Sequence, residues 1–287
     1  MENFDKDIVI IYHASCVDGF ASAYVAWKKF GDNANYFPAK DRQIPPEGLD
    51  GKEVYIIDYS YPLDVMLSLQ ERSKNLVVID HHVSSEENIK SLNNYVFDND
   101  HSGAYLASKY FFPNEEVSKL VSYVEDGDLY KFLLPNSKII SRYINCVDQL
   151  FEEFVSLEKE LNTVSGIEKI IDYGNLLLKV HTDRVNYYAE RAEKVMFEGY
   201  EIYISNASDK VASDLGHVLA EKTNSFSLIY YYSEGFWKCS LRSAGNVDVS
   251  EIAKRYGGGG HHNASGFIVE SINHPLPFVT KINGINE

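Results

Sequence analysis

Short apolar segments alternate with amphipathic ones through the first half of the chain. Residues 7–13, 53–58 and 75–80 each carry a nearly unbroken apolar run that ends in His or Asp. Apolar residues at helical spacing separate these segments, over 21–31 and 62–74. Apolar strands joined by helices predict a parallel sheet with helices packed on both faces. We therefore expect the amino-terminal part of the chain to be an α/β domain.

The rest of the chain predicts a helical region followed by a smaller α/β domain. Helical patterns cover 114–147, with an interruption at 124–132, and then about 167–196. A new series of strands and helices begins at Gly199, and 227–241 is typical of a β-hairpin that turns around Glu234 and Gly235. The patterns together predict an amino-terminal domain, a helical linker and a carboxy-terminal domain, at 1–165, 166–198 and 199–287.

The composition is that of a folded protein without a membrane span. Of the 287 residues, 45% are hydrophobic and 24% are charged, which excludes a disordered chain. No apolar run approaches the roughly 20 residues of a transmembrane helix, and the acidic start MENFDKD is unlike a secretory signal. Three scattered cysteines fit a reducing compartment. We therefore expect a cytoplasmic protein.

The net charge of −15 argues against a surface that binds nucleic acid by positive charge alone. An anionic ligand would need local help. Divalent cations held by some of the carboxylates could supply it, and so could a small group of Arg and Lys.

Three of the predicted strands end in residues that can bind metals, His13, Asp58 and Asp80. In parallel sheets the carboxyl ends of the strands share one edge, and ligands bind beyond that edge. Two further histidines follow the third strand in an expected turn, where both side chains can face one site. The candidate set, with acids from elsewhere in the chain, is His13, Asp18, Asp58, Asp80, His81, His82 and Asp126.

This mixture of carboxylates and imidazoles suits Mn²⁺ or another first-row divalent ion, and it offers enough ligands for two ions. Two ions about 4 Å apart can activate a water molecule and neutralise charge on a phosphoryl group. The set therefore predicts the hydrolysis of a phosphoester.

Five motifs, in order along the chain, resemble those of the DHH phosphoesterase superfamily and its DHH-associated carboxy-terminal domain. They are HASCVDG at 13–19, the strand ending in Asp58, DHH at 80–82, EDGDLY at 125–130 and GGGGHHNASGF at 257–267. The resemblance covers most of the chain. It implies a DHH catalytic domain at 1–165, a substrate-binding domain at 199–287, and two divalent metal ions, with Mn²⁺ expected first.

The resemblance also implies roles for single residues in the first domain. The positions that match metal ligands are His13, Asp18, Asp58, His81 and Asp126. Asp58 would bridge both ions, and Asp128 fits the last position as well as Asp126 because the run DGD permits either. Asp80 matches a position that orients the site or binds a metal, and His82 matches the residue that meets the scissile phosphate.

In the second domain, the resemblance implies a site for the remote part of the substrate. Arg242 ends a predicted strand where the family has an arginine that pairs with a substrate phosphate, a task that suits its planar guanidinium. Glycines let a backbone approach a ligand closely, and bare N–H groups can bind phosphate. The residues that match the family's nucleotide-contacting loop are Gly258, Gly259, Gly260 and His261.

Cys16 stands where the first motif of the family usually has an acid. As a metal ligand, its thiolate would shift the preference of one site towards softer ions such as Zn²⁺ or Fe²⁺. Alternatively, Cys16 is a small buried residue and water completes the metal shell.

Short RNA or DNA oligonucleotides and dinucleotides are the expected substrates, cut to nucleoside monophosphates. Cyclic dinucleotides and 3'-phosphoadenosine 5'-phosphate are alternatives within the same chemistry. An alternative of another class is a sensor that binds nucleotides or RNA without cleaving them, because the first motif lacks an acid. The sequence leaves a homodimer open.

Overall fold

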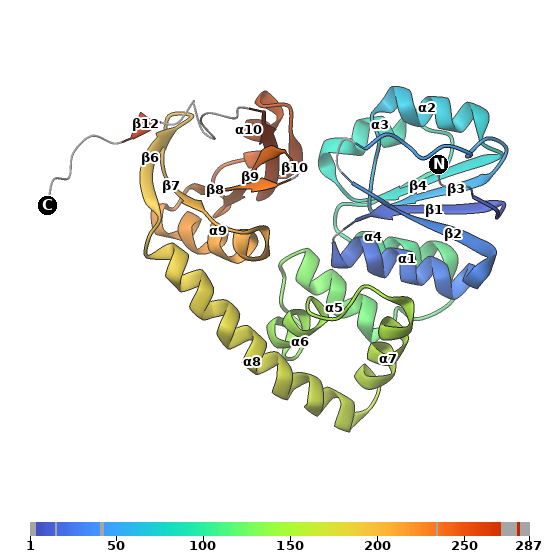
Figure 1. The fold of residues 1–287 in the computed structure, drawn as a ribbon, viewed down its shortest axis with the longest axis horizontal. Helices are drawn as coiled ribbons and strands as arrows, with labels where there is room; N and C mark the ends of the chain where they lie inside the picture. The colour runs from blue at the N-terminus through green and yellow to red at the C-terminus, as the bar shows by residue number, and fades with distance from the viewer. Residues whose placement is uncertain (1–3, 15, 41–42, 234, 271–279, 282–287) are drawn as a thin grey trace, which may run out of the picture. The chain divides into compact units, whose positions relative to one another are not determined.

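The computed structural model describes residues 4–14, 16–40, 43–233, 235–270 and 280–281 (Figure 1). The chain forms two compact units, unit 1 (Met1–Leu178) and unit 2 (Lys179–Glu287), and each unit contains its own sheet. The division between them falls inside helix α8 (Val164–Ala189), within the range expected to be a helical linker.

Unit 1 is built on a five-stranded parallel sheet with the order β2-β1-β3-β4-β5. The predicted parallel sheet is confirmed, and its three central strands are the predicted ones. The two edge strands are additional to the prediction. The strands are β1 (Ile8–His13), β2 (Ala34–Ala39), β3 (Glu53–Ile57), β4 (Asn75–Asp80) and β5 (Tyr95–Phe97).

Helices cover both faces of this sheet, as Figure 1 shows. Alternate residues of the central strands enter two separate cores, with Ile10 on one side and Ile11 on the other. One core includes α1 (Val17–Phe30) and α4 (Gly103–Phe111). The helices on the opposite face are α2 (Leu63–Arg72) and α3 (Glu86–Lys90), with the 3₁₀ turn Val83–Ser85 before α3.

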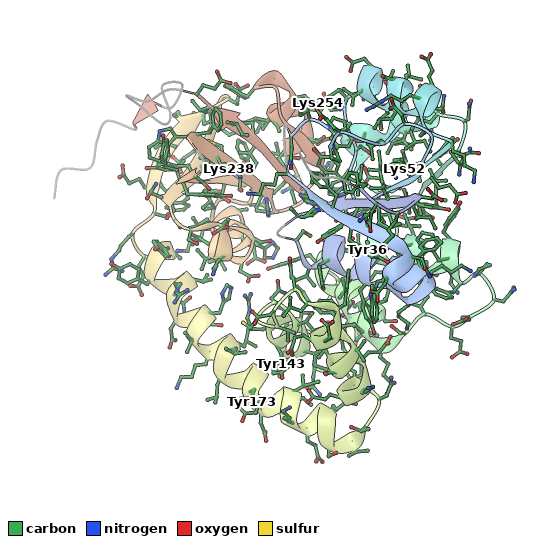
Figure 2. The ribbon with its side chains drawn as sticks, turned by 45° about the vertical axis from the view of Figure 1, so that its right-hand side comes forward. Tyr36, Lys52, Tyr143, Tyr173, Lys238 and Lys254 are labelled. Carbon is green, nitrogen blue, oxygen red and sulfur yellow. The ribbon has the colours of Figure 1, made fainter. Side chains whose placement is uncertain are left out.

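Three further helices extend the core that contains α1 and α4. They are α5 (Lys119–Asp128), α6 (Ser137–Ile144) and α7 (Phe151–Leu161). Tyr36, which is labelled in Figure 2, lies on β2. Its ring packs edge-on against that of Phe151 of α7, with ring centroids 5.0 Å apart. The predicted helical region at 114–147 is thus two helices, separated by a loop at 129–136.

The helix predicted over 167–196 ends earlier than expected, because α8 stops at Ala189 and strand β6 (Glu193–Phe197) follows. β6 and β7 (Tyr200–Asn206) form a hairpin whose two turn residues, Glu198 and Gly199, both have positive φ. Two such residues give the turn whose twist matches that of the paired strands. The prediction was wrong here because the helical periodicity continues past the true end of the helix.

Unit 2 contains a seven-stranded mixed sheet with the order β10-β11-β9-β8-β7-β6-β12. The predicted hairpin at 227–241 is confirmed, since β8 (Phe226–Ser233) pairs antiparallel with β9 (Phe236–Ser243); Glu234 itself lies outside the described residues. The remaining elements are α9 (Asp209–Thr223), α10 (Val249–Arg255), β10 (Gly259–His261), β11 (Ala264–Val269) and β12 (Thr280–Lys281). Within the described ranges, no helix has both the length and the apolar character needed to cross a membrane.

Candidate metal centre and phosphate site

The carboxyl edge of the sheet in unit 1 carries the predicted strand-end residues. His13 and Asp80 are the last residues of β1 and β4, and Asp58 follows β3 directly. Asp58 has a left-handed backbone with φ of 56°, which Asp tolerates better than most residues, and its N–H donates to the carbonyl of Ile79 at 2.8 Å. The strand ends therefore bring these side chains to one edge.

Asp18 reaches the same edge from the first turn of α1, and it is 1% exposed. Its carboxylate accepts hydrogen bonds from the N–H groups of Gly103 (2.7 Å) and Ala104 (3.1 Å), at the amino terminus of α4. The free N–H groups and the helix dipole at this end of a helix favour a negative charge. The start of α4 therefore fixes the orientation of Asp18.

Gly103 is a residue of this site that the sequence interpretation missed. A Cβ atom at this position would lie 2.6 Å from Cβ of Asp58 and 2.9 Å from Oδ2 of Asp18, so a side chain would displace both acids. The sequence signal was the Ser-Gly pair at 102–103. Ser102 caps α4 by accepting a hydrogen bond from the N–H of Tyr105, which marks a helix start, but nothing local points to Asp18.

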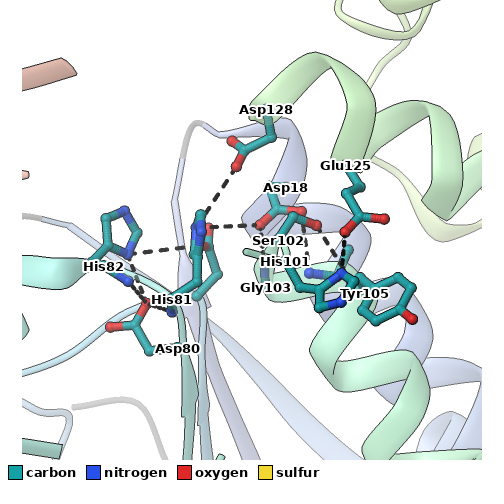
Figure 3. Close-up of polar contacts among 12 residues, drawn as sticks. Asp18, Asp80, His81, His82, His101, Ser102, Gly103, Tyr105, Glu125 and Asp128 are labelled. Atoms are coloured by element: carbon teal, nitrogen blue, oxygen red, sulfur yellow. Dashed lines mark hydrogen bonds and ion pairs between the residues drawn. The ribbon is translucent and has the colours of Figure 1, made fainter. Parts of the chain in front are cut away.

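His81 lies close to three carboxylates, and Figure 3 shows it with two of them, Asp18 and Asp128. Its Nε2 atom is 3.1 Å from Oδ1 of Asp58, 3.7 Å from Oδ2 of Asp128 and 3.9 Å from Oδ2 of Asp18. His81 and the first and last of these acids are almost fully buried. Ligand atoms from Asp18, His81 and Asp128 all lie within 4.8 Å of one another, a spacing suited to a single metal ion.

Burial and mutual repulsion shift the pKa values of the acids and of His81 in this cluster. Burial, followed by the charges of the neighbouring acids, raises the pKa of Asp18 well above its usual range and also raises that of Asp128. Burial acts in the same direction on Asp58, but contacts with His13 and His81 outweigh it and lower the pKa of Asp58. Burial opposes the charging of His81, yet the contact with Asp58 and the nearby acids raise its pKa to about 10. Without a metal, His81 as an imidazolium offsets part of the negative charge of these three acids.

A divalent cation fits the donor set. The buried carboxylates of Asp18 and Asp58 and the more exposed one of Asp128 repel one another, and a nearby positive charge of two stabilises them. Oδ2 of Asp58 is buried and accepts no hydrogen bond from the described residues, and it lies 3.5 Å from Nδ1 of His13. His13, Cys16 and Asp58 form a second group whose ligand atoms lie within 4.8 Å of one another. Asp58 of this second group lies 3.1 Å from His81 of the first, so two neighbouring groups could hold two ions.

Cys16 lies within the second of these groups as a free thiol. Burial raises the pKa of this thiol well above its usual range, and the charges of Asp58, Asp128 and Asp18 raise it further. A bound metal would reverse this effect, since coordination favours the thiolate.

Asp80 faces His82 instead of the three acids. Its Oδ1 accepts hydrogen bonds from the N–H of His81 (2.8 Å) and contacts Nδ1 of His82 at 2.7 Å, while its Oδ2 accepts one from Oγ of Ser60 at 2.7 Å. Asp80 is fully buried, whereas the His82 side chain is 28% exposed. Both Asp80 oxygens are engaged within the protein, so the geometry favours an orienting role for Asp80 over metal binding, although it lies within ligand distance of Asp58 and both histidines.

Asp126 lies outside the cluster, although it matched the last ligand position by spacing. Its carboxylate accepts hydrogen bonds from the N–H groups of Leu133 (2.9 Å) and Leu134 (3.1 Å). Burial would raise its pKa, but hydrogen bonds from Ser137 and from these backbone groups lower it. Asp128, the alternative, is the residue that the structure brings to His81.

In unit 2, Arg242 lies along α9. Its Nε donates to Oγ of Ser213 at 3.4 Å and its Nη1 donates to the carbonyl of Leu241 at 2.9 Å. The side chain crosses Gly216, where a Cβ atom would lie 2.6 Å from Cγ of Arg242. α9 therefore supports the arginine, and a larger residue at position 216 would move it.

The glycine loop is shaped first by contacts within the chain. A Cβ atom at Gly258 would lie 2.0 Å from the carbonyl oxygen of Gly266, and one at Gly260 would lie 2.6 Å from that of Ala264. These two glycines are thus required by the pairing of β10 with β11, without any ligand. We expected these glycines to let the backbone approach a ligand closely. Gly259 is now the main candidate for that role. His261 follows on β10 and is half-buried.

Comparisons with known proteins give the following similarities. The DHHA1 domain family matches residues 194–282. An uncharacterized protein of Acanthamoeba polyphaga mimivirus is 28% identical over an alignment of 303 positions, which spans 96% of this chain and 70% of that protein. The oligoribonuclease NrnB of Bacillus subtilis is 34% identical over 100 residues, which cover 33% of this chain and 25% of NrnB. The crystal structure of RecJ with Mn²⁺ from Thermus thermophilus is similar in fold, with a TM-score of 0.51 at 13% identity, over 91% of this chain and 49% of RecJ.

Proposed function

Because the chain belongs to the DHH phosphoesterase superfamily and carries a DHHA1 domain, we propose that it is a metal-dependent phosphodiesterase that hydrolyses dinucleotides and other short oligonucleotides to nucleoside monophosphates. NrnB, a relative over part of the chain, is an oligoribonuclease, which favours this substrate class.

The observation that carries the proposal is the convergence of Asp18, Asp58 and Asp128 on His81. Buried carboxylates that repel one another destabilise a protein unless a cation joins them, so such a cluster indicates a metal site. His13 and Asp58 complete a second group, with Cys16 beside them. The RecJ structure of similar fold contains Mn²⁺, and we propose two divalent ions here, Mn²⁺ first among the candidates.

His82 is the proposed contact for the scissile phosphate. Its Nδ1 lies 2.7 Å from Oδ1 of Asp80, and this contact fixes the direction of the ring. When bound, the metal ions would activate the attacking water and stabilise charge on the phosphoryl oxygens. The chain itself would position the phosphate, donate a hydrogen bond to it from His82, and supply the buried carboxylates of Asp18 and Asp58 as metal ligands.

Arg242 is the proposed contact for a second phosphate of the substrate, away from the cut. Its guanidinium carries five donors in a fixed plane, which suits a phosphate, and the contacts with Ser213 and Leu241 orient it. A linear dinucleotide offers a further phosphate to such a group, whereas a small phosphodiester does not. Gly259 and His261 are proposed to lie along the same part of the substrate.

The test is turnover by the purified full-length chain after chelation and after addition of Mn²⁺. The substrates are linear dinucleotides, longer oligonucleotides, cyclic dinucleotides and 3'-phosphoadenosine 5'-phosphate, with products separated by chromatography. We expect monophosphates from linear dinucleotides only when metal is present. Tight binding of nucleotides without any turnover in Mn²⁺ would instead support the sensor, and preferred turnover of a cyclic dinucleotide or of 3'-phosphoadenosine 5'-phosphate would correct the substrate.

A further inference from the structure

The loop at 129–136 follows the metal cluster directly and has an unusual backbone. Asp128, the residue before it, is the last residue of α5 and lies beside His81. Three residues of the loop have left-handed backbones, with φ of 54° at Tyr130, 50° at Phe132 and 57° at Asn136. Asparagine adopts this conformation readily, but an aromatic residue does so only at a cost in free energy. Two aromatic residues in this conformation therefore require an explanation.

Several hydrogen bonds hold the loop in this conformation. The buried carboxylate of Asp126 accepts from the N–H groups of Leu133 and Leu134, and its carbonyl accepts from those of Lys131 (2.9 Å) and Phe132 (3.2 Å). Outside these bonds, Nζ of Lys131 donates to the carbonyl of Asp100, and the Tyr123 hydroxyl donates to that of Pro135. A strained backbone that its surroundings hold so firmly is typical of functional sites.

The loop presents a small aromatic surface. The rings of Tyr130 and Phe132 are 4.8 Å apart with an angle of 73° between their planes, and both side chains are half-buried. Leu133 beside them is 81% exposed. Two residues of chain span at most about 7 Å, so the surface starts within that reach of Asp128. A nucleobase stacks on aromatic rings of this kind irrespective of its identity.

We propose that Tyr130 and Phe132 form a subsite for a nucleobase of the substrate, next to the metal centre. The base belongs to a nucleotide whose phosphate is at the metal ions, since the loop begins at one of the metal-binding acids. Asp126 is then a positioning residue that holds the loop and does not bind a metal. This inference rests on the proposed function, because it takes a nucleotide as the ligand.

The test uses Tyr130→Gly, which removes the ring and also relieves the backbone, because glycine adopts a φ of 54° without strain. The variant is expected to fold at least as well as the wild type but to show a KM for a dinucleotide that is about five- to a hundredfold higher. Tyr130→Phe keeps the ring and should retain the wild-type KM. Tyr95→Ala is the matched control, since it removes a part-exposed tyrosine at the amino end of β5. The candidate metal ligands lie at the other end of the strands, the carboxyl end.

Dinucleotides that lack one base at a time identify the stacked base. For the substrate without that base, the wild type and Tyr130→Gly should have the same KM. Equal KM values for both proteins on the complete dinucleotide would overturn the subsite, and so would an equal rise on the complete and base-free substrates.

A measurement without turnover separates this inference from the proposed function. We would titrate the wild type and Tyr130→Gly with the 5'- and 3'-monophosphates of 2-aminopurine riboside in Mg²⁺, since stacking on an aromatic ring quenches the fluorescence of this base. Quenching by the wild type that Tyr130→Gly loses supports the subsite even if no dinucleotide is hydrolysed. If neither protein quenches the base, or both quench it alike, the loop does not hold a nucleobase, even where the wild type hydrolyses dinucleotides.

Discussion

In unit 1 the candidate ligands are buried side chains that contact one another, whereas in unit 2 they are one arginine and a backbone loop shaped by glycines. The acids of unit 1 repel one another, and their pKa values are shifted by burial and by their neighbours. Arg242 instead has polar partners from its own unit, Ser213 and Leu241. From this comparison we expect a cation to complete the site of unit 1, whereas the contacts of Arg242 in unit 2 are made within the protein itself.

A change at Asp58 should have the largest effect, because Asp58 belongs to the candidate metal group with His13 and Cys16 and also contacts His81 of the other group at 3.1 Å. Asp58→Asn keeps the shape of the side chain, and asparagine accepts a φ of 56°. We expect turnover of a dinucleotide to fall by roughly a thousandfold, since metal catalysis supplies several kcal/mol. Near-normal turnover in chelated and then Mn²⁺-supplemented buffer would rule out the two-metal mechanism. Circular dichroism provides the control for folding.

Arg242→Ala tests whether the arginine of unit 2 binds the substrate without affecting the metal site of unit 1. A charge-assisted hydrogen bond to a phosphate contributes about 1.5–3 kcal/mol, so kcat/KM for a dinucleotide should fall about tenfold to a hundredfold. Hydrolysis of a small chromogenic phosphodiester, which lacks the second phosphate, should change little. Arg255→Ala is the matched control, because Arg255 is an exposed arginine of unit 2 that pairs with Glu198. Equal losses on both substrates would mean that the variant damages the protein in general.

Gly103→Ala sharpens the comparison from the side of unit 1, since it adds one carbon atom next to two of the acids. Displacing residues that orient metal ligands typically costs tenfold or more in metal affinity, and we expect roughly tenfold here. Isothermal titration calorimetry, with Mn²⁺ added to protein that has been freed of metal by chelation, measures this loss of affinity. Ala104→Gly changes the same helix turn without adding an atom and should bind Mn²⁺ nearly as well as the wild type. An unchanged affinity in Gly103→Ala would show that the acids can move without cost.

The parts of the fold that the sequence predicted are those with a strong local pattern. β1, β3 and β4 are short apolar runs, and their polar ends mark the edge where the candidate metal ligands lie. The edge strands gave weaker signals, because β2 contains Pro38 and is only partly buried, and β5 has only three residues. Local pattern was enough for the architecture of unit 1 but not for its full extent.

The missed features of the site depend on contacts between distant residues or on the geometry of one turn. Gly103 contacts Asp18 across 85 positions in the chain, and no local pattern reports such a contact. Asp126 and Asp128 are two residues apart at the end of α5, where a step of two turns a side chain by about 200°. Only one of them could face His81, and the spacing alone did not say which.

Cys16→Ser should have the smallest effect on turnover, and it tests whether the acids of unit 1 share their metal with a thiol. The Cys16 sulfur lies with His13 and Asp58 in one group, and a hydroxyl is a poorer and harder donor than a thiolate. We expect the variant to lose relative affinity for Zn²⁺ and Fe²⁺ and to keep its response to Mn²⁺ and Mg²⁺ within a few-fold. Metal content and Co²⁺ absorption in the sulfur-to-metal charge-transfer region measure this directly, without turnover. Cys146→Ser, at an exposed cysteine, is the matched control. A charge-transfer band that survives in Cys16→Ser, or metal profiles identical to those of the wild type, would assign Cys16 to packing and leave the metals of unit 1 to oxygen and nitrogen ligands alone.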